Sequence, residues 1–418
     1  MKIRSASFVA GLASFFFDDQ RAIKAGAGQD GFVYDGDAVT PGFDAVRQPG
    51  ECVSVLLELD DGSLALGDCA AVQYSGAGGR DPLFRAEPFV AQMETQLRPW
   101  LEGRDVSRFL ENSRALDELA IDGQPLHTAI RYGVSQALLD ATALANRCVK
   151  AEVLCREYEL PRIARPVPLF GQSGDDRYRG VDKMILKGVD ALPHGLINNI
   201  PDKLGFQGER LLDYVAWLVE RIEKLRRAQN YRPVLHLDTY GTIGLIFDED
   251  TTRIADYLAR LGAAAGPHRL YIEGPIDAGG RSAQIDALAA LKEQLHARGA
   301  NVHLVADEWC NTYEDVVEFS DAGCCDMVQI KTPDLGAIHH VVEAIQYSRN
   351  RGIESYQGGT CNETDVSARS CVHLALAARP ERMLVKPGMG FDEGMTIVGN
   401  EMHRALAVMR RTGASAGA

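Results

Sequence analysis

At 418 residues the chain is too long for one compact core, which predicts either a barrel with an added domain or two domains of ordinary size. Its content of 46% hydrophobic and 24% charged residues is typical of a globular enzyme. The formal net charge of -14 argues against a nucleic-acid partner, because phosphate binding needs a basic face. An anionic substrate must then be met by a local positive centre, such as a bound divalent cation.

The cysteines and the amino terminus both bear on the cellular compartment. The nine cysteines form no CxxC pair, and Cys324 and Cys325 are adjacent, which favours reduced thiols in a cytoplasmic protein. The apolar run 7–17 ends in two aspartates without a small-residue cleavage site. It is also too short to cross a bilayer, which needs about 20 apolar residues. We therefore expect a strand there and no membrane partner.

The first 160 residues are predicted to form an α+β domain. Residues 53–59 and 63–67 flank an Asp-Asp-Gly turn and predict a β-hairpin, and helical periodicity follows over 89–102 and 128–146. The glycine-rich segment 73–80 between them is either a lid over a site or a plain surface connection.

From about residue 165 onward, short apolar runs alternate with amphipathic segments. Strands are predicted at 167–170, 184–186, 234–237, 270–272, 302–306, 327–330, 355–357 and 383–385, and helices at 208–228, 250–262, 283–298 and 338–352. Eight such repeats predict a closed α/β barrel of the (β/α)8 type over residues 161–418, including a C-terminal helix. No GxGxxG motif supports the competing doubly wound sheet.

Acidic residues follow three consecutive predicted strands. Asp238, Glu273 and Asp307 each stand at a strand end, one βα repeat apart. Because the carboxyl ends of barrel strands converge on one mouth, these carboxylates should crowd together, which is unfavourable unless a cation lies between them. Oxygen ligands without cysteine or histidine favour Mg²⁺. Any one of these acids alone would be read as a surface carboxylate, but three in phase predict a metal site.

The next strand ends in Lys331, which we expect to point into the same mouth as Gln329. A lysine beside a divalent cation should have a lowered pKa and can act as a general base, and the alternative is a structural counter-ion of the acids. His194 follows the second strand candidate, opposite the sixth, and is placed to face Lys331 across a substrate. His236 is one layer deeper than Asp238 and is read as a core or supporting residue.

Three further residues are candidates for holding the substrate. Gln172 ends the first barrel strand and offers an amide group. Thr360 and Cys361 lie in the glycine-containing segment 356–364, where exposed backbone N–H groups and the Thr360 hydroxyl suit a carboxylate. Cys361 is a weak candidate for a nucleophile, since no histidine partner is placed for it.

These motifs resemble the methylaspartate ammonia-lyase family of the enolase superfamily. The similar segments are 171–178, 236–244, 272–275, 305–312, 328–336, 358–364 and 386–390. The resemblance implies a barrel with an amino-terminal capping domain and Mg²⁺-dependent deamination of L-threo-3-methylaspartate to mesaconate and ammonia through an enediolate intermediate. It implies a homodimer, as well as help from a monovalent cation such as K⁺.

The resemblance also implies roles for the candidate residues. Asp238, Glu273 and Asp307 correspond to metal ligands and Lys331 to the base for the C3 proton. His194 corresponds to the residue on the opposite face, which assists elimination or serves the other diastereomer. The positions that hold the substrate correspond to Gln172, Gln329, Thr360 and Cys361.

Two other functions stay open from the sequence. One is another enolase-superfamily reaction on a carboxylate substrate, such as acid-sugar dehydration or amino-acid epimerisation. The other is a non-catalytic, metal-dependent barrel that binds a dicarboxylate, which would tolerate loss of Lys331. A fumarase-type aspartase is disfavoured, because those enzymes are long helical bundles and this chain alternates strands with helices.

Overall fold

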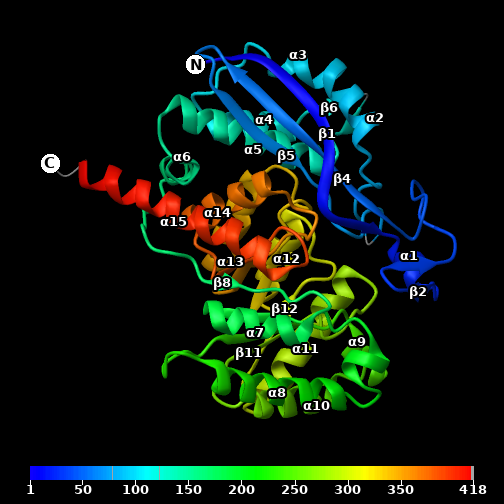
Figure 1. Ribbon diagram of the computed structural model, residues 1–418. Coiled ribbons are helices and arrows are strands. Elements are labelled where there is room, and N and C mark those ends of the chain that lie inside the picture. The colour runs from blue at the N-terminus through cyan, green and yellow to red at the C-terminus, as the bar shows by residue number, and fades with distance from the viewer. Residues whose placement is uncertain (78, 122, 416–418) are drawn as a thin grey trace.

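The amino-terminal part of the molecule is built on a three-stranded antiparallel sheet in the order β1-β4-β5 (Figure 1). The computed structural model describes residues 1–77, 79–121 and 123–415. The apolar run near the amino terminus lies in β1 (Ile3–Asp18), and the predicted hairpin is formed by β4 (Arg47–Leu59) and β5 (Leu64–Cys69). Alternate residues of β4 are buried, as expected for a sheet with one covered face. Short two-stranded pairs are formed by β2 (Gly28–Asp30) with β3 (Val33–Asp35) and by β6 (Ala120–Ile121) with β7 (Gln124–Pro125).

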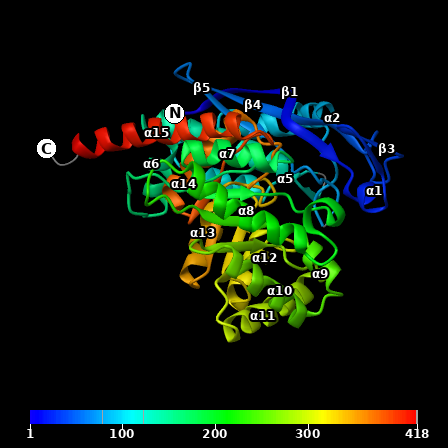
Figure 2. The same cartoon turned by 60° about the horizontal axis from the view of Figure 1, so that its bottom comes forward.

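Helix α5 (Thr128–Ala145) covers the inner face of this sheet and separates it from the barrel (Figures 1 and 2). The contact is close, because a Cβ atom on Gly67 of β5 would lie 2.2 Å from the carbonyl oxygen of Gly133 in α5. The helix predicted over 89–102 is interrupted by a π-helical turn. The other elements here are α1 (Gln20–Lys24), α2 (Ala86–Gln92), the π turn η1 (Met93–Leu97), α3 (Arg98–Leu101), α4 (Phe109–Asp117) and α6 (Lys150–Glu157).

The second part is a closed barrel of eight parallel strands, as predicted. Its strands in chain order are β8 (Leu169–Phe170), β9 (Ala191–His194), β10 (Val234–Asp238), β11 (Leu270–Glu273), β12 (Val302–Ala306), β13 (Met327–Ile330), β14 (Glu354–Gln357) and β15 (Arg382–Leu384). Strand β15 pairs with β8 and so closes the ring.

Helices surround the barrel, and the last one extends away from it (Figure 1). They are α7 (Arg177–Lys187), the π turn η2 (Ile200–Leu204), α8 (Glu209–Leu225), α9 (Thr242–Ile246), α10 (Thr251–Ala264), α11 (Arg281–Ala297), α12 (Tyr313–Ala322), α13 (His339–Asn350), α14 (Asp365–Ala378) and α15 (Phe391–Ser415). The predicted helices 208–228, 250–262, 283–298 and 338–352 correspond to α8, α10, α11 and α13. Helix α15 is the expected C-terminal helix.

The prediction of a strand at 184–186 is wrong. These residues lie in α7, where Val181, Met184 and Ile185 are buried at helical spacing. A short apolar run does not by itself distinguish a strand from the buried face of a helix. The second barrel strand is instead β9, which ends at the predicted site residue His194.

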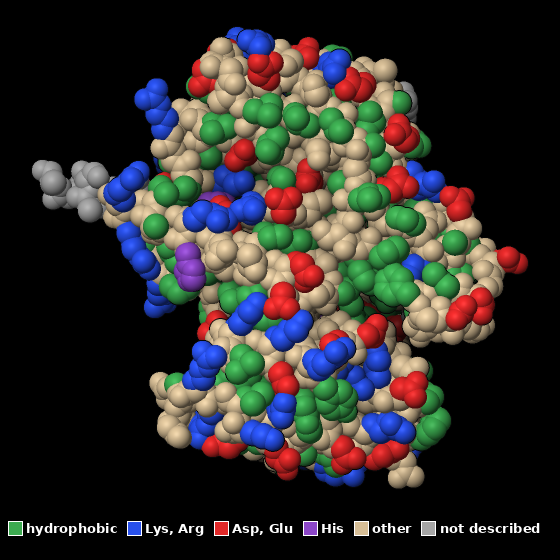
Figure 3. All heavy atoms as spheres, viewed as in Figure 1, with side chains coloured by type: hydrophobic (Ala, Val, Ile, Leu, Met, Phe, Trp, Pro, Cys, Tyr) green, Lys and Arg blue, Asp and Glu red, His purple; other side chains and the backbone are tan. Residues whose placement is uncertain are grey.

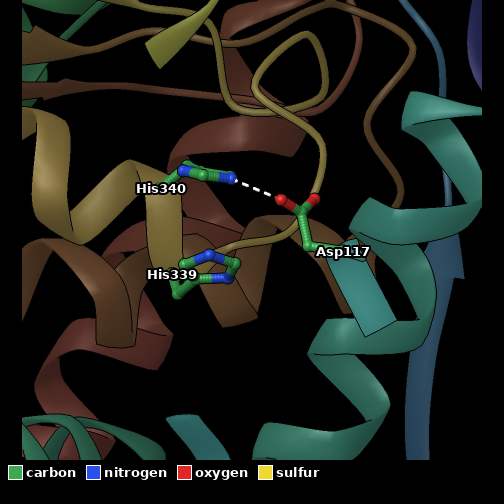
Figure 4. A group of neighbouring side chains, drawn as sticks. All are labelled: Asp117, His339 and His340. Carbon is green, nitrogen blue, oxygen red and sulfur yellow. Dashed lines mark hydrogen bonds and ion pairs between the residues drawn. The ribbon is translucent and has the colours of Figure 1, made fainter. Parts of the chain in front are cut away.

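Polar contacts join the amino-terminal part to the barrel. Figure 4 shows Asp117, at the end of α4, pointing toward His340 of α13, with 2.8 Å between the carboxylate and Nε2. Tyr132 of α5 donates a hydrogen bond to the buried carboxylate of Glu363 beyond β14, at 2.8 Å. Glu363 is in turn paired with the buried ammonium of Lys386 at 2.8 Å.

The surface carries charges of both signs. In the face shown in Figure 3, Lys and Arg side chains are interspersed with Asp and Glu over the barrel helices. Within the described ranges, none of the helices combines the length and the apolar character needed to cross a membrane.

Candidate active site

A cavity of about 750 Å³, including its mouth, lies where the barrel strands end and the amino-terminal part covers them. The amino-terminal part contributes Gln20, Val72, Gln73, Tyr74 and Arg80 to its lining. The barrel contributes Gln172, His194, Leu196, Asp238, Tyr240, Asp307, Glu308, Gln329, Lys331, Gly359, Thr360, Cys361, Leu384 and Met389. Three residues of the segment 73–80, namely Gln73, Tyr74 and Arg80, are therefore part of the cavity wall, while Gly78 lies outside the described residues.

Strand register sets the height of each predicted metal ligand. Asp238 of β10 pairs directly with Glu273 of β11, whereas Glu273 pairs with Val305 of β12, so that Asp307 stands two residues further up. His194, Asp238 and Glu273 each offer a ligand atom within 4.8 Å of the others. Asp307 is outside that group, although it lines the same cavity and its charge acts on both carboxylates.

Burial raises the pKa of Asp238 and of Glu273 well above their ordinary values, and the charge of Asp307 adds to this effect on both. The pKa of Glu308 is also raised well above its usual value, by burial and by the charge of Asp307. Burial acts on Asp307 in the same sense, but the attraction of Lys331 outweighs it and lowers the pKa of Asp307. The positive charge of Lys331 is thus not enough to balance the negative charges of these carboxylates.

These residues fit a divalent cation. Neighbouring carboxylates that raise one another's pKa are the condition that a bound cation relieves. Their oxygen atoms suit Mg²⁺, which also keeps water or substrate ligands. His194 lies beside this set, with Nε2 3.7 Å from the carboxylate of Asp238. Asp238, Glu273 and Asp307 are the residues that would hold the ion.

Glu273 is held by residues from the barrel interior. Tyr356 donates its hydroxyl to the carboxylate, with 2.7 and 2.9 Å to the two oxygens. His236 is completely buried, and its Nε2 lies 2.8 Å from Glu273 Oε2. The expectation that His236 is a supporting residue agrees with this contact. Gln329 donates its amide nitrogen to the Tyr356 hydroxyl, while its Oε1 is buried without a hydrogen-bond partner in the described residues.

Lys331 and His194 come from opposite sides of the ring, since β9 and β13 are four strands apart in it. The Lys331 amine is 2.5 Å from Asp307 Oδ1 and 3.1 Å from Asn311 Oδ1. Burial would lower the pKa of Lys331, but Asp307 outweighs it and raises that pKa. Burial lowers the pKa of His194 to about 4, so its imidazole is neutral at pH 7. The structure thus brings both groups to one cavity.

The remaining candidates also line the cavity. Gln172 donates its amide nitrogen to the carbonyl oxygens of Val385 and Gly388, at 3.3 and 2.7 Å, which leaves its oxygen for further contacts. Thr360 accepts the backbone N–H of Asn362 at 3.2 Å. The Cys361 thiol lies 3.5 Å from Gln73 Oε1, and burial raises its pKa to about 12, which agrees with its dismissal as a nucleophile.

Several lining residues escaped sequence reasoning. Tyr74 and Arg80 belong to the glycine-rich segment 73–80. Its glycine content drew attention to the segment but did not indicate which of its side chains line the cavity. Tyr240 stands two residues after Asp238, and Leu384 lies on a strand that was predicted at nearly the right place. Side chains alternate between the two faces of a strand, and this alternation would have indicated that Leu384 lies on the inward face of β15.

Comparisons with known proteins give the family. The amino-terminal family model of methylaspartate ammonia-lyase matches residues 1–159, and the C-terminal model matches 162–411. The methylaspartate ammonia-lyase of Citrobacter amalonaticus is 63% identical over 98% of this chain and 99% of its own, and that of Clostridium tetanomorphum is 53% identical over 98% and 100%.

Solved structures agree with the sequence matches. The C. amalonaticus enzyme containing (2S,3S)-3-methylaspartic acid superposes with a TM-score of 0.97, covering 98% of this chain and 100% of that one. The C. tetanomorphum Mg-complex has a TM-score of 0.95 at 52% identity, covering 99% and 100%. A muconate lactonizing enzyme from Pseudomonas fluorescens shares the fold, with a TM-score of 0.59 at 16% identity over 90% of this chain and 84% of its own.

The closed barrel, the cap over its mouth and the carboxylates at three consecutive strand ends define a capped α/β-barrel enzyme. Within that class, the chain belongs to the methylaspartate ammonia-lyase family.

Proposed function

We propose that the chain catalyses the Mg²⁺-dependent deamination of L-threo-3-methylaspartate to mesaconate and ammonia. The observation that carries this proposal is a single cavity. It is lined by the Lys331 amine, the His194 imidazole and the carboxylates of Asp238, Asp307 and Glu308. The substrate named is the ligand of the C. amalonaticus crystal structure, and Mg is the ion named for the C. tetanomorphum complex.

Lys331 is proposed as the base that takes the proton from C3. The electron pair of the C3–H bond becomes the C2=C3 double bond, the C2–N bond breaks and the nitrogen leaves as ammonia. A hydrogen beside a carboxylate is barely acidic, because its removal adds negative charge to that group. Asp238, Glu273 and Asp307 would hold Mg²⁺, whose positive charge would stabilise the negative charge that develops on this carboxylate.

The other side chains are proposed to hold the substrate between these groups. His194 lies across the cavity from Lys331, where its neutral imidazole assists elimination or serves the other diastereomer. The oxygens of Gln172 and Gln329 are acceptors suited to the substrate ammonium. The Thr360 hydroxyl and the backbone around Cys361 suit a carboxylate.

Incubation with L-threo-3-methylaspartate tests the proposal. We expect ammonia release and mesaconate absorbance with Mg²⁺, and neither product after chelation. Lys331→Ala should keep the folded state and Mg²⁺ binding but lose turnover. Wild-type rates in this variant would contradict the assignment of the base. Arg85→Met is a matched control, because Arg85 is a cation of the cap paired with Asp44 and Glu51 outside the cavity lining.

The same assay separates the two alternatives. Turnover of an acid sugar or epimerisation of an amino acid, without ammonia release, would favour another enolase-superfamily reaction. Binding of a dicarboxylate without any turnover would favour the non-catalytic barrel.

Three further features are proposed from family membership. We infer that the enzyme works in the cytoplasm, that it forms a homodimer and that a monovalent cation such as K⁺ raises its activity. Sedimentation of the purified chain measures the oligomeric state. Replacement of K⁺ by tetramethylammonium at constant ionic strength measures the cation effect.

A further inference from the structure

Arg80 connects the cap to the neighbourhood of the Lys331 amine. Its Nε donates to Asp334 Oδ2 at 2.8 Å, and its Nη2 donates to Asn311 Oδ1 at 3.0 Å. The same Asn311 oxygen accepts the Lys331 ammonium at 3.1 Å. One amide oxygen therefore joins a side chain of the cap to the proposed base of the barrel.

The charges around this junction are arranged in pairs. Lys331 is a buried cation and Arg80 is a partly buried one, and Arg80 is ion-paired with Asp334 while Lys331 is ion-paired with Asp307. The Arg80 side chain is only 15% exposed, so its contacts form in a region with little solvent screening. Only Asn311 receives hydrogen bonds from both of these cations among the contacts described here.

The shape of the guanidinium group matters at this position. Its planar fork lets Nε and Nη2 reach Asp334 and Asn311 at the same time with fixed relative directions. A lysine ammonium offers a compact point charge on a flexible stem. A hydrophobic residue of similar length would fill the space without either hydrogen bond.

We propose that Arg80 is a positioning residue for the reaction: Arg80 fixes Asn311, and Asn311 fixes the direction of the Lys331 amine. This inference rests on the proposed function, in which Lys331 is the base.

Arg80→Met tests the inference, with Arg85→Met as the matched control in the cap. We expect kcat of Arg80→Met to fall roughly 100-fold, the order of loss that follows a displacement of about 1 Å in a catalytic group. The dissociation constant for mesaconate with Mg²⁺ and the Mg²⁺ activation constant should stay unchanged. A merely structural role would weaken mesaconate binding along with kcat, so this split distinguishes positioning from packing.

Further variants test the route through Asn311. Arg80→Lys should recover only a small part of kcat, whereas guanidinium added to Arg80→Ala should recover more than methylammonium at equal concentration. The double variant Arg80→Met with Asn311→Leu should lose no more kcat than the worse single variant, because both substitutions break one chain of contacts.

The outcomes are distinguishable from failure of the proposed function. Full activity of Lys331→Ala would overturn the base assignment and this inference with it. An inactive Lys331→Ala beside an Arg80→Met with wild-type kcat would overturn the inference alone. Losses that multiply in the double variant, or weakened mesaconate binding in Arg80→Met, would also overturn it.

Discussion

Tyr356 supports the proposed metal site without lining the cavity. Its hydroxyl donates to Glu273 and accepts from Gln329, and its ring packs on His236 with 5.0 Å between the ring centroids. A hydrogen bond to a ligating carboxylate fixes the direction of its oxygen atoms, and loss of such support typically costs 10–100-fold in metal affinity.

Tyr356→Phe should therefore raise the Mg²⁺ concentration needed for half-maximal activity by roughly 10-fold or more. Titration of Mg²⁺ by activity and by calorimetry measures the change. Tyr347→Phe is the control, since Tyr347 donates to Asp321 on the surface and should leave the Mg²⁺ titration unchanged. Equal Mg²⁺ affinity in Tyr356→Phe and the wild type would show that the hydroxyl does not orient Glu273.

At the residue scale, the sequence predicted which side chains reach the barrel mouth but not how they pair. The spacing of Asp238, Glu273 and Asp307 was enough to place all three at strand ends. It did not show that Asp307 stands higher than Glu273, because strand register depends on pairing between chain segments. Arg80 escaped for the same reason, since its partners are more than 200 residues away.

The segment beyond β14 depends on a glycine at position 359. Gly359 has a φ of +129°, and a Cβ atom there would lie 2.3 Å from Lys386 Nζ and 2.8 Å from Thr332 Oγ1. Lys386 is completely buried and is fixed by Glu363, Thr332 and the Gly358 carbonyl, so it has no room to move.

Gly359→Ala should lower the free energy of unfolding by more than the roughly 1–3 kcal/mol that the backbone conformation alone costs. It should also raise KM, because Thr360 and Cys361 follow directly in the cavity wall. Chemical denaturation and steady-state kinetics measure both effects. Gly279→Ala is the control, with a φ of +74° but open space around its Cβ, and it should lose about 1–2 kcal/mol and no activity. Equal losses of stability in the two variants would show that the Lys386 side chain shifts to make room for the added methyl group.

At the element scale, strand–helix alternation predicted the barrel, and most of its strands lie where the apolar runs placed them. The exception is β9, which has only four residues and includes Pro193. Such a strand forms because it pairs with β8 and β10 more than because of its own composition. The apolar residues of α7, by contrast, form a short run in the sequence that has the pattern of a buried strand.

At the scale of the whole molecule, Asp117 joins the cap to the barrel. It accepts from Arg131 of α5 at 2.7 Å and lies 2.8 Å from His340 of α13. Burial would raise the pKa of Asp117, but His340 and Arg131 outweigh it and lower that pKa to about 2. A lowered carboxyl pKa stabilises the folded state above the ordinary value of 3.8, and this contribution is lost as the pH falls toward 2.

Asp117→Asn should reduce the free energy of unfolding by roughly 1–2 kcal/mol at pH 7, a figure that allows for the partial exposure of the pair. The difference from the wild type should shrink as the pH falls from 4 toward 2. Urea denaturation at a series of pH values measures it. Asp286→Asn, on the exposed side of α11, should match the wild type throughout. A constant difference across this range would contradict the role of the Asp117 charge.

The contact between Tyr132 and Glu363 has a consequence for synthesis on the ribosome. The two residues are 231 positions apart, so at about 5–20 residues per second the nascent helix α5 waits roughly 10–50 s for its partner to emerge. During that interval α5 lacks its contacts with α14. A chaperone that acts during translation would find its target on this helix, and the cavity is complete only after the segment beyond β14, with Thr360 and Cys361, has been made.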